Sequence, residues 1–226
     1  MRWQDKGYLL SLNKYNENSA IAEFFTKNNG KISGVIYGAT SKKIKNYLLI
    51  GNKFHLNFNF KQDAKLGYFK VEIDEVNTPL YLDNKIKLFC IIYTMNIVKI
   101  LTVENQEIKN IYQLLTNYFE LLNNDNWLTN FIFWELNLYK CLGYDIDFKN
   151  YVKNVTVDGD EKFIVESTKK IIPNFLINSD FFTNNKKDII NGFKIVGEFL
   201  DKSILKPNNI NFPLSRIELG NLIKQI

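Results

Sequence analysis

Residues 19–39 read SAIAEFFTKNNGKISGVIYGA, and the expected architecture of the amino-terminal part of the chain is built outward from them. Two runs rich in β-branched and aromatic residues flank the tetrapeptide Lys27-Asn28-Asn29-Gly30. Asn and Gly tolerate the positive φ angles that tight hairpin turns require. Gly34 and Gly38 in the second run indicate a bulge or sharp bend, which the closing of a small barrel requires. The stretch therefore predicts a β-hairpin.

Three further stretches alternate polar and apolar residues, as half-buried strands do. In the clearest of them, KFHLNFNF, every second residue is apolar. The predicted strands are residues 7–15, 19–27, 31–39, 53–60 and 67–75. Five short strands in one domain match a small barrel of the oligonucleotide-binding (OB) type. An SH3-like barrel would give a similar pattern, so periodicity alone leaves the topology open.

After Thr78-Pro79 the apolar residues recur at every third or fourth position, which indicates amphipathic helices. The predicted helices are residues 82–102, 107–123, 127–142, 186–204 and 214–226. A short β-hairpin is expected near 152–166, around Asp158-Gly159. The sequence thus predicts an α+β protein with a five-stranded barrel domain at 1–78, followed by a mainly α-helical domain at 79–226 that carries the hairpin.

Positive charge is concentrated in the first 60 residues, although the whole chain has a formal net charge of +5. This segment contains nine basic and three acidic side chains, whereas the remaining residues contain 20 basic and 21 acidic ones. Such an asymmetry favours a surface for a polyanion, although a solvated face that keeps the protein in solution would look the same. Lysine binds phosphate as a point charge, so we expect little sequence specificity.

The strongest candidate for nucleic-acid contact follows the third predicted strand, where three lysines lie close together in a segment expected to be a flexible loop. Tyrosines near these lysines in sequence could stack on the bases of a single strand, although tyrosines in β-rich domains more often pack inside. The predicted nucleic-acid-binding residues are Lys14, Tyr15, Lys27, Lys31, Tyr37, Lys42, Lys43, Lys45 and Tyr47.

Residue types that serve catalysis or metal binding are scarce. The single histidine, His55, lies on the polar face of a predicted strand, and the acidic cluster at 158–161 lacks the spacing of a calcium loop. Cys90 and Cys141 lie in apolar helical stretches and predict buried, reduced thiols, which suits a cytoplasm. Neither a signal peptide nor a transmembrane helix is indicated. We therefore expect no catalytic residue, no metal and no cofactor.

Four different motifs follow one another along the chain. Residues 15–19, YNENS, fit a G-E-x-S turn except that Asn16 stands where glycine is frequent, and residues 34–39, GVIYGA, fit a G-x-x-x-G-A/G segment followed by basic residues. Residues 142–147, LGYDID, fit L-G-[YF]-x-[LI]-D, and residues 212–216, FPLSR, resemble an L-P-x-x-R tail. In this order and spacing the motifs resemble those of the RecO family of bacterial recombination mediators.

The resemblance implies an OB-fold barrel and a helical domain that bind single- and double-stranded DNA and anneal complementary strands. It also implies help in loading the RecA recombinase onto gaps coated with single-strand-binding protein (SSB). The implied partners are RecR, the acidic carboxyl-terminal tail of SSB and, in some lineages, RecF; the implied location is the cytoplasm, at the nucleoid. Some members carry a four-cysteine zinc module, but residues 150–166 contain no cysteine, so zinc is not expected here.

Other functions stay open on the residues alone. The chain could be an adaptor that binds only proteins and carries an incidental charge on its barrel. It could also be a generic OB-fold protein for RNA or single-stranded DNA. A nuclease is the third alternative, and it would require a pair of carboxylates that act with magnesium.

Overall fold

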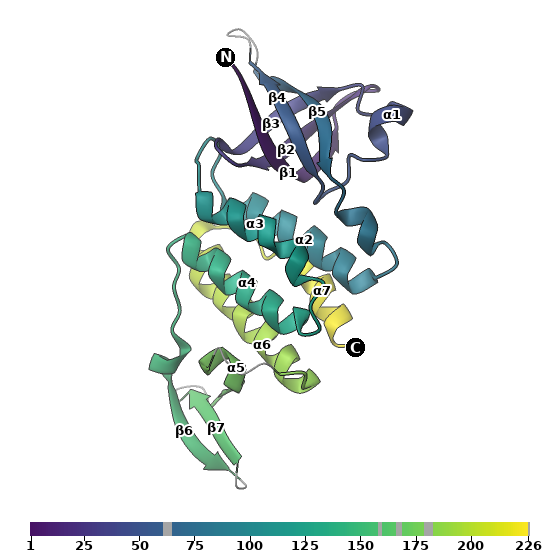
Figure 1. The fold of residues 1–226 in the computed structure, drawn as a ribbon. Coiled ribbons are helices and arrows are strands. Elements are labelled where there is room, and N and C mark those ends of the chain that lie inside the picture. Colours follow the sequence, from purple (N-terminus) through teal and green to yellow (C-terminus); the bar gives the residue numbers. More distant parts are fainter. Residues whose placement is uncertain (61–64, 158–159, 166–168, 179–182, 226) are drawn as a thin grey trace. The chain divides into compact units, whose positions relative to one another are not determined.

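The computed structural model describes residues 1–60, 65–157, 160–165, 169–178 and 183–225 (Figure 1). The described residues divide into two compact units. The first unit contains Met1–Thr116 and Pro213–Leu219, and the second contains Asn117–Phe212 and Gly220–Ile226. The first unit is thus larger than the barrel and includes helical segments that pack on it.

The barrel of the first unit is closed, and its described strands follow the order β1-β2-β3-β5-β4. They are β1 (Arg2–Lys14), β2 (Ser19–Thr26), β3 (Gly30–Tyr37), β4 (Lys53–Asn59) and β5 (Gly67–Glu75). Neighbouring strands are antiparallel except β3 and β5, which pair in parallel. This closed five-stranded arrangement confirms the predicted OB-fold barrel. The strand order also gives the topology, which periodicity alone left open.

Strand β1 begins at Arg2, earlier than the predicted start at residue 7, because it pairs with two neighbouring strands. Its first half pairs with β4 and its second half with β2, and the register shifts between Leu9 and Ser11. A bulge of this kind bends a strand and increases its twist, which helps the sheet to close.

Gly34, which lies within β3, and Gly38, which follows the strand, have different roles. Gly34 pairs regularly with Ala22, so no bulge lies there. A Cβ at Gly34 would instead come within 2.6 Å of the Phe69 ring, so the missing side chain gives that ring its space. Gly38 adopts a φ of +71°, and the sharp bend predicted near this end of the strand is present there.

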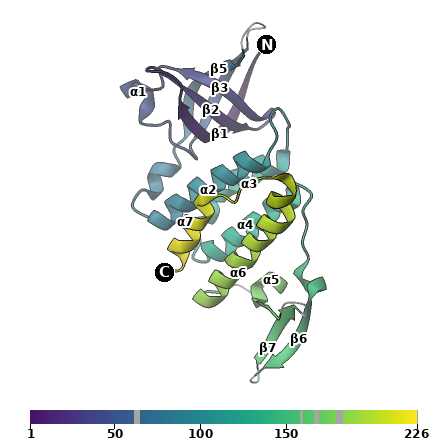
Figure 2. The ribbon, with the colours of Figure 1, turned by 180° about the vertical axis from the view of Figure 1, so that it is seen from behind.

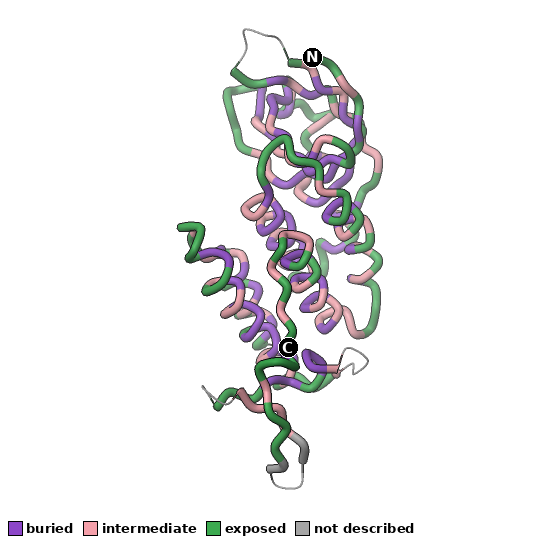
Figure 3. The backbone as a smooth tube through the Cα atoms, turned by 90° about the vertical axis from the view of Figure 1, so that its left-hand side faces the viewer, coloured by how far each residue is buried: buried purple, intermediate pink, exposed green. Residues whose placement is uncertain are grey.

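The barrel interior is filled by one cluster of apolar residues from all five strands. Aromatic rings dominate it: Phe24 and Phe69 lie 5.0 Å apart between ring centroids, and Trp3 stacks on Phe58 at 4.8 Å. Large rings in edge and stacked contacts fill a small barrel with few side chains. Figure 3 shows the resulting mixture of buried and exposed positions along the chain.

The helical segments of the first unit pack on the barrel or on one another. They comprise the 3-10 helix η1 (Thr78–Tyr81), α2 (Lys85–Leu101), the first part of α3 (Lys109–Leu121) and the first part of α7 (Leu214–Ile223). Tyr8 of β1 contacts both Tyr112 and Thr116 of α3, with a hydroxyl–hydroxyl distance of 3.5 Å to Thr116. Arg216 of α7 is buried with its guanidinium 5.8 Å from the centre of the Tyr93 ring of α2.

The second unit is mainly helical, and Figure 2 shows α4 and α6 side by side. Its elements are α4 (Trp127–Cys141), η2 (Phe148–Tyr151), β6 (Val152–Val157), β7 (Asp160–Val165), β8 (Ile171–Ile172), α5 (Asn174–Ile177), α6 (Lys186–Phe199), the π-helix η3 (Leu200–Leu205) and η4 (Lys206–Asn208). The predicted hairpin is present as β6 and β7, and its turn at Asp158-Gly159 lies outside the described residues. Strand β8, which the sequence did not predict, joins β7.

Candidate nucleic-acid interface

Two loops that are separate in sequence meet at one end of the barrel. Tyr37, the last residue of β3, pairs with Ser19, the first residue of β2. Beyond this pair, Thr40 donates a hydrogen bond from Oγ1 to the carbonyl oxygen of Glu17 at 3.1 Å. The β1–β2 turn is thereby fastened to the segment that follows β3, and the basic and aromatic residues of both are brought to one rim.

The lysine-rich segment after β3 is a single helical turn, α1 (Lys42–Lys45), and the prediction of a flexible loop was wrong. The segment forms a helical turn because two of its apolar side chains pack against the barrel. Ile44 packs against the barrel core, and Leu48 just beyond the helix is only 5% exposed. Because these two side chains face inward, Lys42, Lys43 and Lys45 are exposed.

We call this end of the barrel the basic rim, formed by Lys14, Tyr15, Tyr37, Lys42, Lys43 and Lys45. All six side chains are exposed, and the two tyrosines are 59% and 63% exposed. Glu17 is the acidic residue in the adjoining turn. Exposed lysines beside exposed aromatic rings can bind phosphates and stack on bases at the same time, which is how single strands are usually held.

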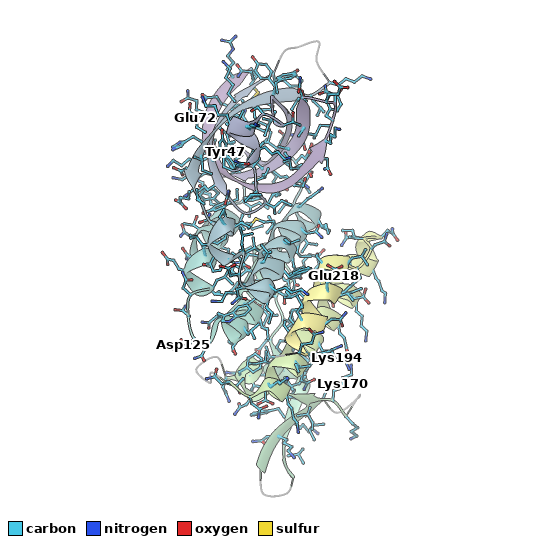
Figure 4. All side chains as sticks on the ribbon, turned by 90° about the vertical axis from the view of Figure 1, so that its right-hand side faces the viewer. Tyr47, Glu72, Asp125, Lys170, Lys194 and Glu218 are labelled. Atoms are coloured by element: carbon cyan, nitrogen blue, oxygen red, sulfur yellow. The ribbon has the colours of Figure 1, made fainter. Side chains whose placement is uncertain are left out.

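Tyr47 is placed differently from the other predicted tyrosines. Its ring lies 6.2 Å from that of Phe54 and packs against the barrel core. The backbone carbonyl oxygen of Tyr47 accepts a hydrogen bond from Nδ2 of the buried Asn52 at 2.9 Å. Figure 4 labels Tyr47 on the barrel. The structure therefore assigns this tyrosine a packing role.

Lys27 and Lys31 lie at the β2–β3 turn, away from the basic rim at the other end of these strands. Lys27 is exposed, but Lys31 is half-buried and donates from Nζ to the carbonyl oxygen of Lys99 at 2.7 Å. Burial lowers the pKa of Lys31, and the charges of Glu23 and Glu104 only partly oppose this. Lys31 is thus engaged in packing between β3 and α2.

Tyr68 is an aromatic residue beside the basic rim that was not among the predicted nucleic-acid-binding residues. Its ring lies 5.8 Å from that of Tyr37, because the parallel pairing of β3 with β5 places Tyr68 opposite Val35. The alternation of residues 67–75 puts Tyr68 on the outward face with Lys70, so a signal was available in the sequence. Tyr68 enlarges the aromatic surface beside Tyr37.

His55 is on the surface, as predicted, and is 48% exposed. Its Nε2 lies 2.8 Å from Oδ1 of Asp74, which Lys6 also contacts at 3.1 Å. Burial would raise the pKa of Asp74, but the Lys6 hydrogen bond and the surrounding positive charges lower it below 3.8. The histidine therefore belongs to a cluster of surface side chains around Asp74.

The described part of the chain holds no group of three or more His, Cys, Asp or Glu side chains placed to bind a metal ion. The acidic side chains at 158, 160 and 161 lie outside this description. No described helix has both the length and the apolar character needed to span a membrane. Cys90 is buried as predicted, whereas Cys141 is half-buried.

The closed barrel with its basic rim places the chain in the class of OB-fold proteins. Residues 1–75 match the family model described as Recombination protein O N terminal, and residues 83–209 match the one described as Recombination protein O C terminal. The chain therefore belongs to the RecO family of DNA repair proteins, and the resemblance read from its motifs is confirmed.

Relatives named DNA repair protein RecO align along most or all of the chain. The one from Wolbachia sp. subsp. Drosophila simulans is 26% identical over 245 residues, which cover 99% of each chain. The one from Ehrlichia chaffeensis is 26% identical over 243 residues, covering 99% of this chain and 98% of the relative. The one from Rickettsia canadensis is 31% identical over 159 residues, covering 70% of this chain and 66% of the relative.

Proposed function

We propose that this RecO family protein is a non-enzymatic mediator of DNA repair and recombination. In this proposal it binds single- and double-stranded DNA, anneals complementary strands and helps to load the RecA recombinase onto gaps coated with SSB. The observation that carries the proposal is the basic rim of the OB-fold barrel, where four exposed lysines lie beside two exposed tyrosines.

The composition of the rim supports binding that does not depend on base sequence. Lysines neutralise phosphates as point charges and release condensed counterions, so affinity should fall steeply with salt. Tyr15 and Tyr37 offer ring faces, and every base has a face on which an aromatic ring can stack. A mediator that anneals any pair of complementary strands requires this tolerance.

The proposed partners follow from membership of the family. They are RecR, the acidic carboxyl-terminal tail of SSB, RecA and RecF, and the proposed location is the cytoplasm, at the nucleoid. A protein-only adaptor would need these partners but not the rim. The exposure of the rim lysines favours the DNA-binding mediator over the adaptor.

The decisive experiment is annealing of complementary strands that are coated with SSB. The wild-type chain should accelerate annealing, and it should leave labelled DNA intact in the presence of magnesium. Failure to anneal coated strands would overturn the mediator, and loss of DNA with magnesium would instead indicate a nuclease.

A charge variant tests the rim itself. Replacing Lys42, Lys43 and Lys45 with Gln should weaken DNA binding on the order of tenfold or more. The plot of log affinity against log salt should flatten by roughly 0.7–0.9 for each phosphate that is no longer neutralised. The matched control replaces Lys85, Lys109 and Lys224, three exposed lysines outside the rim, with Gln. If both variants bind DNA equally well in an anisotropy assay, α1 is not part of the interface.

A further inference from the structure

A second basic surface lies in the helical unit, far from the barrel in sequence. Lys187 and Lys194 of α6 are seven residues apart in sequence, which is close to two helical turns, and Lys202 of the π-helix η3 follows eight residues later. All three are exposed. The opposite side of the same helix is buried through Ile189, Phe193 and Val196. The three lysines therefore form a stripe that packing leaves open to solvent.

The segment just before β8 brings Lys170, with Lys169 next to it in sequence, to the same part of the unit. Asn191 of α6 donates from Nδ2 to the carbonyl oxygen of Ile171 at 2.9 Å, which holds the β8 strand along the helix. Lys170 just before the strand is ion-paired through Nζ with Glu198 Oε2. Figure 4 labels Lys170 and Lys194, which lie on the same side of the unit. Lys169 precedes them and is exposed.

We call these five residues the lysine face: Lys169, Lys170, Lys187, Lys194 and Lys202. Glu198 lies among them, and its pKa is lowered by the hydrogen bond from Lys170 and by the charges of Lys202 and Lys194, against the opposing effect of burial. One carboxylate thus interacts with three lysines at once. Positive charge on this face exceeds negative charge.

The neighbouring carboxylates have other partners. Asp201 Oδ2 pairs with Lys206 Nζ at 2.6 Å. Asp188 Oδ2 lies 3.5 Å from Oγ1 of Thr183, at the start of α6. The excess charge of the lysine face is therefore carried into solvent, where it is available to a polyanion.

We propose that the lysine face is a second contact surface for the phosphates of a nucleic-acid backbone; this inference rests on the proposed function. Lys187 and Lys194 are about 10 Å apart along α6, in which each residue rises about 1.5 Å, and Lys202 lies eight residues further along the chain in η3. A small anion would occupy one end of such a stripe, whereas a strand with a phosphate at about every 3.4 Å of duplex axis would engage its whole length. An acidic peptide is the competing occupant.

The test replaces Lys187, Lys194 and Lys202 with Gln in the full chain. Lys170 is kept so that Glu198 retains its partner, and Gln preserves much of each aliphatic stem. The control replaces Lys140, Lys149 and Lys224 with Gln, which removes the same charge from exposed positions elsewhere in this unit. Fluorescence anisotropy with a labelled 30-nucleotide strand should show affinity lowered about tenfold and a shallower salt slope for the first variant alone.

Three outcomes separate the possibilities. Unchanged affinity and slope in the lysine-face variant, while the wild type binds DNA, would overturn this inference and leave the proposed function standing. Unchanged DNA affinity together with lost binding of a labelled oligoglutamate peptide would also overturn it and would assign the face to an acidic peptide. Absence of DNA binding by the wild type would instead refute the proposed function on which the inference rests. Thermal melting by circular dichroism confirms that each variant is folded.

Discussion

Lys31 of β3 donates a hydrogen bond from Nζ to the backbone carbonyl oxygen of Lys99, in the last turn of α2, at 2.7 Å. Carbonyls at a helix carboxyl end lack partners within the helix, and a cation there also interacts favourably with the helix dipole. Lys99 in turn reaches Glu23 of β2 with Nζ 2.6 Å from Oε2. A lysine that belongs to the basic amino-terminal segment in sequence thus fastens the barrel to a helix.

Replacing Lys31 with Ala should therefore lower the free energy of unfolding by about 1–2 kcal/mol, because a half-buried carbonyl loses a charged donor. DNA affinity should change little. Replacing Lys14, which is exposed on the basic rim, with Ala should weaken DNA binding and leave the free energy of unfolding nearly unchanged. Urea unfolding and DNA anisotropy on both variants check this. A Lys31 variant with native stability and weakened DNA binding would place Lys31 in the interface instead.

Tyr37 and Tyr47 should respond in opposite ways to substitution. Tyr37→Ala removes a 63% exposed ring and should cost about 1–3 kcal/mol of binding to single-stranded DNA, with an unchanged salt slope because stacking releases no counterions. Tyr47→Ala removes a ring packed on the barrel core and should mainly reduce the stability of the fold. Equal loss of DNA binding in two stable variants would show that both rings contact bases.

Gly30 and Gly38 provide a matched pair of substitutions in the barrel. Both have positive φ, +68° and +71°, so alanine at either position is strained. At Gly30 the added Cβ would also lie 1.9 Å from the carbonyl oxygen of Gln106, whereas at Gly38 nothing lies within 4 Å. Gly38→Ala should cost about 1–2 kcal/mol, the strain of the left-handed conformation. Gly30→Ala should cost clearly more in urea unfolding, and equal costs would show that the Gln106 backbone moves freely.

The pH dependence of stability should contain a contribution from Glu23. Burial would raise its pKa, but the hydrogen bonds from Lys99 and Ser11 and nearby positive charge hold it below the ordinary value of 4.5. The ionised carboxylate therefore stabilises the fold fully above pH 4.5, and this stabilisation is lost as the pH falls through the lower folded-state pKa.

Glu23→Gln should accordingly be less stable than the wild type at pH 7 and should show a flatter decline of stability below pH 4.5. The measurement is the urea midpoint from about pH 7 down to about pH 3. Glu17→Gln, at an exposed position of the β1–β2 turn, is the control. A wild-type curve that matches the Glu23 variant throughout would show that the Lys99 pair contributes nothing.

Most strands and helices could be predicted because their patterns are local. Residues 53–60 alternate polar and apolar side chains, and β4 occupies Lys53–Asn59. The apolar period of residues 82–102 predicted α2, which spans Lys85–Leu101. Helix α1 could not be predicted, because one helical turn has little stability of its own and is held here by the packing of Ile44 on the barrel core.

The basic rim was predictable only as a set of residue types. Composition and charge selected the lysines and tyrosines, and the turn signals placed several of them in connecting segments. Which of them share one end of the barrel depends on strand pairing, in particular on the β2–β3 register that sets Tyr37 beside the β1–β2 turn. The parallel pairing of β3 with β5 adds Tyr68, which was not predicted, beside Tyr37. The lysine face was missed because the carboxyl-terminal three quarters of the chain are nearly neutral overall and its lysines gather only on the folded helix.

The amino-acid sequence by itself determined the α+β architecture, the five-stranded barrel and the family, because alternation, helical period and motif order are properties of the chain. Only the tertiary structure decided which of the predicted residues are exposed and which are held in packing. Lys31 and Lys99 are 68 positions apart, and Tyr47 contacts a core assembled from all five strands. The availability of a side chain depends on partners brought close by folding, and no local pattern records those partners.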